Sequence, residues 1–206
     1  MTGSAAKAHR LLAPRVAYLI GTRDRNGTTN VIPVSNVTSV STDPQHVLLA
    51  IYKQWRTHDV LLNAAGFTLS VPLIGHLEGV WILAARYSHY PAANPHEKIT
   101  ASGLTFDYDA SPYGPILVDG IGWMDCRIME TTELGGDHSI VIGQAQQVRF
   151  NPEFLDSEGI PHAQTSPLMQ VTGNRFTTAT QLQQVPYYGQ NSNETGQGPG
   201  SKSSVG

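Results

Sequence analysis

Short strand-forming segments separated by turn residues follow one another along most of this chain. Residues 16–22 (VAYLIGT) lead into Asn26-Gly27, which favours a tight hairpin because both residue types tolerate positive φ. The next candidate strands cover residues 28–34, 37–41, 46–52 and 67–71. Strands do not alternate with long helices here, so a doubly wound parallel sheet is disfavoured. The pattern predicts a mainly β fold with α+β elements, a closed antiparallel barrel with short helices inserted between its strands.

A second group of strands is predicted in the other half of the chain. Residues 120–134 alternate apolar and polar side chains, as expected of a strand with two different faces. The segment 135–138 (GGDH) supplies a turn, and residues 139–150 return as the partner strand. Weaker strand patterns follow at residues 169–172 and 175–178.

Three short helices are predicted between the strands. Thr57 is a candidate N-cap for the first, and Gly66 fits the position just after its last turn. Residues 77–86 carry apolar side chains at helical spacing. The third helix begins at Asn94-Pro95, a good cap followed by a proline in the first turn, and Glu97 can reach back to the amide of the cap.

Composition and charge restrict the class of protein. The 206 residues suit one domain, expected at residues 14–185 between an N-terminal arm (1–13) and a disordered Gly/Ser/Asn-rich tail (186–206). A formal net charge of −3 without a basic block argues against nucleic-acid binding. No apolar run reaches the length of a membrane span, and the N-terminus lacks an apolar signal core. With a single cysteine, these features predict a soluble, cytoplasmic protein.

Several common catalytic signatures are missing from the sequence. No glycine-rich dinucleotide fingerprint follows the first strand, and neither a P-loop nor a Gly-x-Ser-x-Gly elbow occurs. His96-Glu97 begins like a zinc-peptidase motif, but Thr100 stands where the second histidine is required. One cysteine cannot build a thiolate cluster, and Cys126, on an alternating strand, is expected to be buried and structural. We therefore predict no metal site.

Four segments, in order along the chain, carry a family resemblance. They are NVIPVSNVTSVSTDP (30–44), RTHDVLLNAAGFTLSV (56–71), HEKITASGLTF (96–106) and MDCRIMETTELGGDHSIVIGQAQQV (124–148). With these motifs the sequence resembles the flavin reductase-like proteins, which share an FMN-binding split β-barrel. The fold that the resemblance implies agrees with the antiparallel barrel expected from the strand pattern.

The resemblance implies a homodimer that binds FMN, or sometimes FAD, without a covalent link. Many such proteins oxidise NADH or NADPH and release reduced flavin to a partner monooxygenase, so an NAD(P)H:flavin oxidoreductase is the leading hypothesis. Three alternatives stay open: a flavoprotein that retains FMN and acts on a separate organic substrate, a non-catalytic flavin-binding module, and a barrel without a cofactor. The segment 76–98 is longer than the resemblance leads us to expect. Its candidates for lining the site of a second substrate are Trp81, Tyr87, His89 and Tyr90.

Small polar side chains at residues 33–41 are the first candidate cofactor contacts. Short hydroxyl side chains let the backbone approach a ligand and supply hydrogen bonds, although an ordinary edge strand with outward polar residues has the same composition. The resemblance favours flavin contacts by Pro33, Val34, Ser35, Asn36, Val37, Thr38, Ser39 and Ser41. The next strand-to-helix junction holds the candidates for the flavin phosphate, which are Lys53, Arg56 and Thr57. Plain helix capping and solvated charge are the alternative explanation of these residues.

The GGDH turn and two further residues supply the candidate catalytic and substrate contacts. The resemblance implies that His138 lies by the flavin and the nicotinamide, where it orients the pyridine nucleotide or assists proton delivery; a turn histidine is otherwise usually solvated. The candidate substrate-binding residues with it are Asp137, Lys98 and Trp81. Hydride transfer itself needs no protein acid or base, because the cofactors carry that chemistry.

Overall fold

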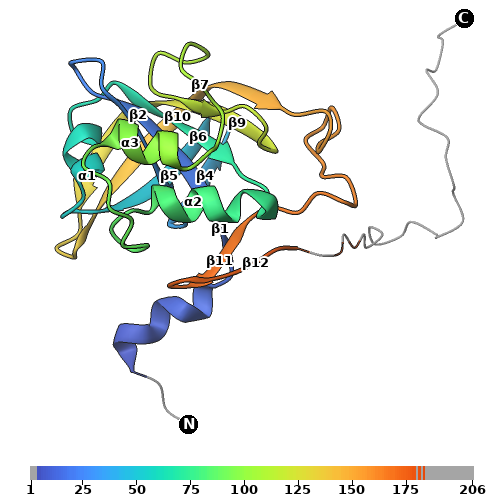
Figure 1. The fold of residues 1–206 in the computed structure, drawn as a ribbon, viewed down its shortest axis with the longest axis horizontal. Helices are drawn as coiled ribbons and strands as arrows, with labels where there is room; N and C mark the ends of the chain where they lie inside the picture. Colours follow the sequence, from blue (N-terminus) through green and yellow to red (C-terminus); the bar gives the residue numbers. More distant parts are fainter. Residues whose placement is uncertain (1–3, 180, 182, 184–206) are drawn as a thin grey trace, which may run out of the picture.

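The computed structural model of the protein describes residues 4–179, 181 and 183. Its main sheet has seven antiparallel strands in the order β3-β2-β6-β9-β10-β5-β4 (Figure 1). They are β2 (Tyr18–Arg23), β3 (Thr29–Val34), β4 (Val37–Thr42), β5 (Gln45–Tyr52), β6 (Gly66–Val71), β9 (Gly122–Glu133) and β10 (His138–Phe150). β9 and β10 form the long hairpin predicted from the sequence, and β9 lies at the centre of the sheet.

The two edge strands of this sheet, β3 and β4, are consecutive in the chain. Only Ser35 and Asn36 separate them, so the sheet has to curl until its edges come within reach of a two-residue link. No ladder pairs β3 with β4 within the described residues, and Asn36 O instead accepts a hydrogen bond from Ala50 N of β5 (2.9 Å). The predicted antiparallel barrel is therefore confirmed, and an unpaired seam at Ser35 and Asn36 splits it.

Two apolar clusters hold the fold together, one on each face of the curled sheet. Strand β2 contributes to both through its alternation, because Ile20 packs into the first cluster and Leu19 into the second. The first also contains Phe67 and the buried Cys126, whose thiol has its pKa raised to about 12 by burial and by the charge of Asp125. The predicted structural position of this cysteine is confirmed. Full burial of one such apolar side chain contributes about 1.5–3 kcal/mol.

Helices α1 (Arg56–Leu61) and α2 (Leu77–Leu83) differ from the prediction at their ends. Thr57 is not the N-cap of α1: Trp55 holds that position without a side-chain cap, and Thr57 is buried inside the helix. Its Oγ1 accepts a hydrogen bond from Asn30 Nδ2 (2.9 Å), so a tertiary contact replaces the predicted cap. Gly66 does not follow the last turn either, because it begins β6, where the backbone of Cys126 and the Tyr113 ring leave no room for a side chain.

Helix α3 (Pro95–Ala101) begins as predicted. Asn94 Oδ1 accepts a hydrogen bond from Glu97 N (2.9 Å), and Pro95 occupies the first turn. The Glu97 carboxylate reaches back one residue further than expected, to the amide of Ala93 (2.6 Å). These contacts fix the start of α3, and the helix packs on β3 and α2 through the second apolar cluster, which includes Val80, Leu83 and Ile99.

A smaller three-stranded sheet lies beside the barrel, in the order β1-β11-β12. It consists of β1 (Arg15–Val16), β11 (Met169–Thr172) and β12 (Arg175–Thr177), so the two weaker strand predictions are confirmed. The 3₁₀ helix η1 (Ala5–Leu12) projects from this sheet and buries none of its side chains (Figure 1). A second 3₁₀ turn, η2 (Ile74–His76), and the short pair β7 (Phe106–Asp107) and β8 (Ile116–Leu117) complete the elements. The predicted tail at 186–206 lies outside the described residues.

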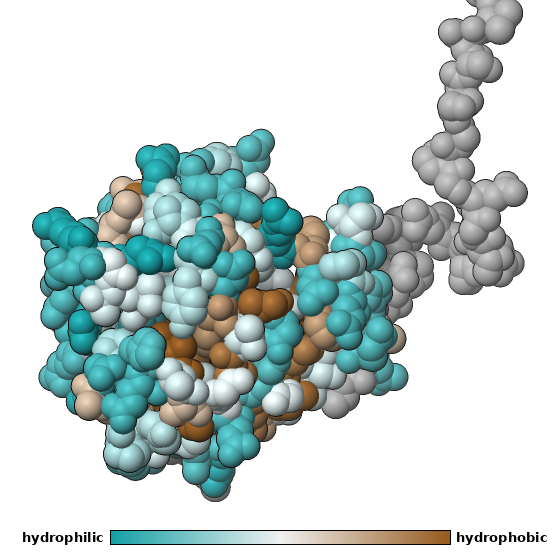
Figure 2. All heavy atoms as spheres, turned by 45° about the horizontal axis from the view of Figure 1, so that its top comes forward, coloured by the Kyte–Doolittle hydropathy of each residue, from teal (hydrophilic) through white to brown (hydrophobic). Residues whose placement is uncertain are grey.

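The surface is mostly polar, but Figure 2 shows a face on which apolar side chains gather in a hollow between polar surroundings. None of the helices in the described part of the chain is long and apolar enough to cross a membrane. Scattered exposed apolar residues are normal for a folded domain, whereas a hollow with apolar walls is a common form of ligand site.

Candidate functional site

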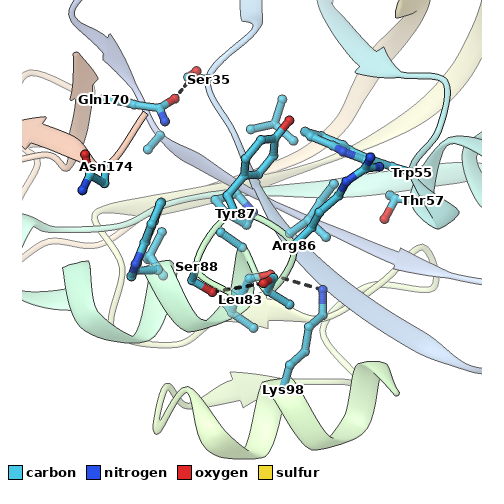
Figure 3. Close-up of a pocket in the computed structure, with 18 of the residues that line it drawn as sticks. Ser35, Trp55, Thr57, Leu83, Arg86, Tyr87, Ser88, Lys98, Gln170 and Asn174 are labelled. Atoms are coloured by element: carbon cyan, nitrogen blue, oxygen red, sulfur yellow. Dashed lines mark hydrogen bonds between the residues drawn. The ribbon is translucent and has the colours of Figure 1, made fainter. Parts of the chain in front are cut away.

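A cavity of about 900 Å³ opens between the helices and the smaller sheet. Its walls come from β3, from the junction before α1, from α2 and the segment that follows it, from α3, and from the β11-β12 hairpin (Figure 3). This volume is near the upper end for sites that enclose one small organic ligand. The cavity reaches the barrel seam, because Ser35 and Asn36 are among its lining residues.

The cavity is lined by positive charge alone. Its cations come from four different elements or junctions: Arg15 on β1, Arg56 on α1, Arg86 after α2 and Lys98 on α3. Among the described residues that line it, none is an aspartate or a glutamate. None of these four side chains takes part in an ion pair within the described part of the chain, although the whole protein has a net charge of −3. Such a site favours an anionic ligand.

Lys98 is the most confined of these cations, because only 8% of it is exposed. Its Nζ donates a hydrogen bond to Leu83 O (3.3 Å), and no carboxylate compensates its charge among the described residues (Figure 3). Burial, together with the positive charge of Arg56, lowers the pKa of this ammonium to about 8. A buried charge without a partner is costly, so a bound anion would offset a cost that the folded protein already carries.

Aromatic side chains form the apolar part of the lining. The rings of Trp55 and Tyr87 meet edge to face with centroids 5.9 Å apart, and those of Trp81 and Phe176 do so at 5.8 Å. The second contact ties α2 to β12 and so joins the barrel side to the smaller sheet. Flat apolar walls of this kind suit a planar ligand and exclude water from it.

Three lining residues hold buried polar atoms that have no hydrogen-bond partner among the described residues: Arg15 Nε, Asn30 Oδ1 and Trp55 Nε1. Most buried polar groups in native proteins are paired, so unpaired ones at a cavity indicate groups that await a ligand or water. Asn30 is oriented by its other side-chain atom, which donates to Thr57 Oγ1. Ser35 is similarly fixed, because its hydroxyl donates to Gln170 Oε1 (2.8 Å) across the cavity edge (Figure 3).

The structure brings part of the predicted site together in this cavity. The predicted residues that line it are Pro33, Val34, Ser35, Asn36, Arg56, Thr57, Trp81 and Lys98. Those that do not line it are Val37, Thr38, Ser39, Ser41, Lys53, Asp137 and His138. Of the aromatic and histidine candidates in the long segment before α3, Tyr87 and His89 line the cavity and Tyr90 does not.

The four residues of β4 leave the cavity because the chain changes direction at the seam. From Val37 onward it pairs with β5 and runs along the outer edge of the sheet. Thr38 and Ser39 are exposed there, and Ser39 bonds within its own neighbourhood, to Ser41 O and Gln45 Nε2. Within this single chain, these four residues therefore do not line the cavity.

The GGDH turn lies behind the cavity wall rather than in it. His138 Nδ1 is 2.7 Å from Asp137 Oδ1, and this hydrogen bond holds the pKa of the Asp137 carboxyl below its usual range. The His138 ring packs on Tyr52 (5.4 Å between centroids), and Tyr52 meets Trp55 edge to face at 6.0 Å. A row of rings thus links the turn to the cavity, but neither Asp137 nor His138 reaches its surface in this chain.

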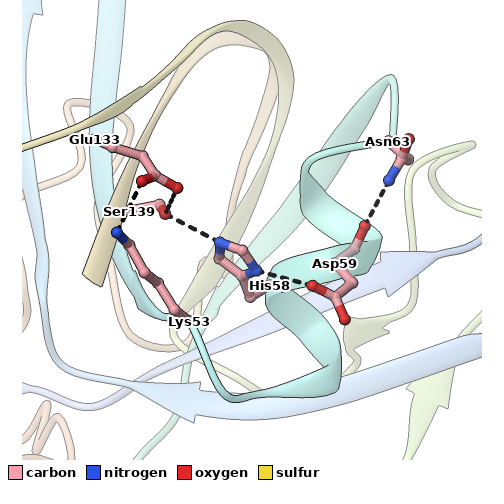
Figure 4. A network of polar contacts seen from close by, with 6 residues as sticks. All are labelled: Lys53, His58, Asp59, Asn63, Glu133 and Ser139. Atoms are coloured by element: carbon pink, nitrogen blue, oxygen red, sulfur yellow. Dashed lines mark hydrogen bonds and ion pairs between the residues drawn. The ribbon is translucent and has the colours of Figure 1, made fainter. Parts of the chain in front are cut away.

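A polar network behind α1 was not predicted from the sequence (Figure 4). The buried His58 bonds through Nε2 to Ser139 Oγ (3.0 Å) and through Nδ1 to Asp59 Oδ1 (3.0 Å). Ser139 Oγ donates to Glu133, and Lys53 forms an ion pair with the same carboxylate (2.8 Å). The contact with Lys53 lowers the pKa of the Glu133 carboxyl. The order Ser-His-Asp resembles a hydrolase triad, but Ser139 is fully buried and lines no cavity, so the network holds α1 against the β9-β10 hairpin.

Several lining residues could not be found from local patterns. Arg15 and Gln170 are far apart in the sequence and meet only through the pairing of β1 with β11. Asn30 carried a weak signal in the sequence, since it is a polar residue near the start of an apolar strand, and the structure buries it. Arg86 lies in the segment that we expected to be helical, but α2 ends at Leu83, before the predicted end of the helix at residue 86.

Comparison with known proteins gives a consistent result. The sequence model of one family, described as the flavin reductase like domain, matches residues 10–178. Three solved structures share the fold: an FMN-binding protein of Thermus thermophilus with bound 1-cyclohex-2-enone (TM-score 0.71, 19% identity, 90% of this chain and 98% of that one), nitrilotriacetate monooxygenase component B of Bacillus cereus (0.74, 16%, 89% and 95%), and the NADH:FAD oxidoreductase of Streptomyces globisporus C-1027 (0.66, 18%, 85% and 95%). At these identities the structures establish the fold alone.

Proposed function

Because the chain belongs to the flavin reductase-like family, we propose that it is an FMN-dependent oxidoreductase whose flavin lies in the cation-lined cavity. The observation that carries this proposal is the charge of that cavity, with four Lys and Arg side chains and no acidic residue among its described lining. FMN carries a phosphate group that such side chains bind through charge-assisted hydrogen bonds. The aromatic walls match its planar ring system.

We assign the flavin phosphate to Arg56, Thr57 and Lys98. Arg56 and Lys98 lie close enough for the charge of one to affect the pKa of the other. Thr57 Oγ1 already accepts from Asn30, so its own hydroxyl proton remains available for a phosphate oxygen. Lys98, first expected to contact substrate, fits the phosphate better because of this proximity.

The ring system and the ribityl chain are assigned to the seam and the adjacent wall. Ser35 and Asn36 offer small polar groups, and Pro33 and Val34 add apolar surface to the lining beside them. Trp55 Nε1 and Asn30 Oδ1 are a buried donor and a buried acceptor without partners, and a flavin ring edge presents both acceptors and a donor. The β4 candidates Val37, Thr38, Ser39 and Ser41 are assigned to the subunit contact of the proposed homodimer, because an exposed sheet edge is usually covered.

When bound, the flavin supplies the redox chemistry, since it accepts a hydride from a reduced nicotinamide. The chain positions the two rings and excludes water with Trp55, Tyr87 and Trp81. We propose NADH or NADPH as the donor, which the shared fold with an NADH:FAD oxidoreductase supports, and FAD as the alternative flavin. Transfer of reduced flavin to a partner monooxygenase is supported by the shared fold with a monooxygenase component B.

A second candidate function is a flavoprotein that keeps its FMN and acts on an organic substrate. The shared fold with an FMN-binding protein that holds cyclohexenone favours it. So does the lining of this cavity by the long segment after α2, which includes Tyr87 and His89. The two candidates use the same flavin site and differ in the second ligand.

The test is to titrate the purified protein with FMN and to follow the oxidation of NADH and NADPH with and without added flavin. We expect FMN to bind and nucleotide oxidation to depend on it. A protein that neither binds FMN nor oxidises either nucleotide would refute the proposal. Retained FMN without nucleotide oxidation would favour the second candidate, and a bound flavin that no donor reduces would indicate a non-catalytic module.

A further inference from the structure

The cations of the cavity fall into two groups on different elements. Arg56 belongs to α1, Arg86 to the segment after α2, and Lys98 to α3. Arg15 lies on β1 in the smaller sheet, and His9, on η1, lines the cavity from the same side. In Figure 3, Thr57, Arg86 and Lys98 are on one side of the cavity, whereas Gln170 and Asn174 of the β11-β12 hairpin are on the other.

Arg15 has no protein acceptor for its buried donor. Its Nε is buried without a hydrogen bond in the described part of the chain, and no carboxylate pairs with it there. Gln170, its partner on the neighbouring strand, bonds elsewhere: its Oε1 accepts from Ser35, and its Nε2 donates to Gly173 O (2.9 Å). A half-buried guanidinium with unused donors matches the planar geometry of carboxylate and phosphate groups.

One phosphate accounts for only one of these groups. In the proposed function, Arg56, Thr57 and Lys98 hold the flavin phosphate, which leaves the Arg15 side without a ligand. We propose that Arg15, assisted by His9, binds an anionic group of the second substrate, either a phosphate of the nicotinamide dinucleotide or the carboxylate of an organic acid. This inference rests on the proposed function for the identity of the first ligand, but the Arg15 subsite is open to measurement by itself.

The test compares Arg15→Met with the wild type and with Arg175→Met as a matched control. Arg175 lies in the same small sheet, is exposed and does not line the cavity. Calorimetry measures the binding of NAD⁺ to FMN-loaded protein. It also compares the binding of para-nitrobenzoate with that of its neutral amide, para-nitrobenzamide. Steady-state kinetics compare NADH with reduced 1-benzylnicotinamide, a hydride donor without an anionic group. Titrations with FMN and FAD monitor the flavin site.

We expect Arg15→Met to weaken NAD⁺ binding and raise the KM for NADH by about 10- to 100-fold, the loss typical of a hydrogen bond to a charged group. FMN affinity, the KM for benzylnicotinamide and all values for Arg175→Met should stay near those of the wild type. If NAD⁺ binding is unchanged but para-nitrobenzoate loses its advantage over the amide, the subsite holds and the organic acid is its ligand.

Two results would overturn the inference. One is that Arg15→Met alters charged and neutral ligands equally or not at all. The other is that FMN or FAD affinity falls, because the anion bound by Arg15 would then belong to the flavin. A wild type that does not bind FMN would refute the proposed function instead, and calorimetry of NAD⁺ and para-nitrobenzoate with the wild type and Arg15→Met would still decide the subsite.

Discussion

Two groups of charged side chains lie on either side of helix α1, one behind it and one in the cavity. They differ in whether each charge has a partner. Behind the helix, Lys53 pairs with Glu133, and His58 bonds to both Asp59 and Ser139. In the cavity, Arg56 and Lys98 have no carboxylate partner in the described part of the chain. The first group is complete without a ligand, whereas the second is incomplete.

We interpret this difference as one between groups that support the fold and groups that are proposed to bind a ligand. Hydrogen bonds and ion pairs between protein groups stabilise the folded state modestly, and groups paired in this way need no ligand to satisfy them. A buried cation without a partner destabilises the folded state, so a cation of this kind in a cavity is typical of a site that binds an anion. Lys98, at 8% exposure, is the clearest case in this molecule.

The largest expected effect is the loss of FMN affinity in Lys98→Met. We expect the dissociation constant to rise about 10- to 100-fold, because one charge-assisted hydrogen bond to the phosphate is removed. The flavin-free variant should unfold at a higher temperature than the wild type, because the substitution removes an uncompensated buried charge. Fluorescence titration and thermal unfolding measure both effects, and Lys53→Met is the control with a paired lysine. Unchanged FMN affinity would remove Lys98 from the phosphate site.

The pH dependence of FMN binding should follow Lys98. Its pKa in the flavin-free protein is about 8, so the ammonium is charged below that pH and neutral above it. FMN affinity is expected to fall above pH 8, by up to about tenfold per pH unit, because one proton is taken up with the ligand. In Lys98→Met this decline should be absent. A wild-type profile that is flat between pH 7 and 9 would contradict the assignment.

The same group links pH to stability in the opposite direction. The pKa of Lys98 is lowered from 10.5 to about 8 in the folded protein, so the unfolded chain binds more protons between these values. Its contribution to the free energy of unfolding therefore increases with pH over that window, by about 3 kcal/mol if the shift is fully expressed. Denaturant unfolding of the flavin-free wild type and of Lys98→Met, at pH 7 and pH 10, isolates this contribution. A difference between the two proteins that does not shrink with pH would count against it.

His138→Ala tests a residue that lies behind the cavity wall. We expect nicotinamide-dependent turnover to fall several-fold while FMN affinity stays within about twofold, because the ring reaches the cavity only through Tyr52 and Trp55. Stopped-flow reduction of bound FMN and an FMN titration give the two values. An unchanged reduction rate would remove the proposed role of His138.

The smallest effect on the ligand is expected from the paired network. Ser139→Ala leaves His58 Nε2 without its buried partner and should lower the free energy of unfolding by about 1–3 kcal/mol. FMN affinity should change by less than about twofold, since Ser139 lines no cavity. Denaturant unfolding and the FMN titration provide the comparison. Loss of FMN affinity with unchanged stability would reverse the distinction between the two groups.

The strands were predictable because their signal is local. Alternation and turn residues identified β9 and β10, and the Asn94 cap identified the start of α3. The errors lie where tertiary contacts override local preference. Thr57 has the side chain of a good N-cap, but its hydroxyl accepts from Asn30 inside the protein, 27 residues away in the sequence.

The predicted residues that line the candidate cavity are ones for which a local pattern or a family motif gave a signal. The seam at Ser35 and Asn36 was found because small polar residues interrupt a strand pattern. Arg15 was not found, because its place in the cavity depends on the pairing of β1 with β11 across most of the chain. The β4 residues share the composition of the seam but follow the outer edge of the sheet, and composition alone does not report that change of direction.

The most direct test of the central claim compares the affinity of the wild-type protein for FMN and for riboflavin, which differ only in the phosphate. If Arg56 and Lys98 bind that phosphate, FMN should bind at least about 10-fold more tightly than riboflavin, and Lys98→Met should reduce the difference. Equal affinities for the two flavins in the wild type would contradict the claim that the unpaired cations of the cavity are there for the phosphate.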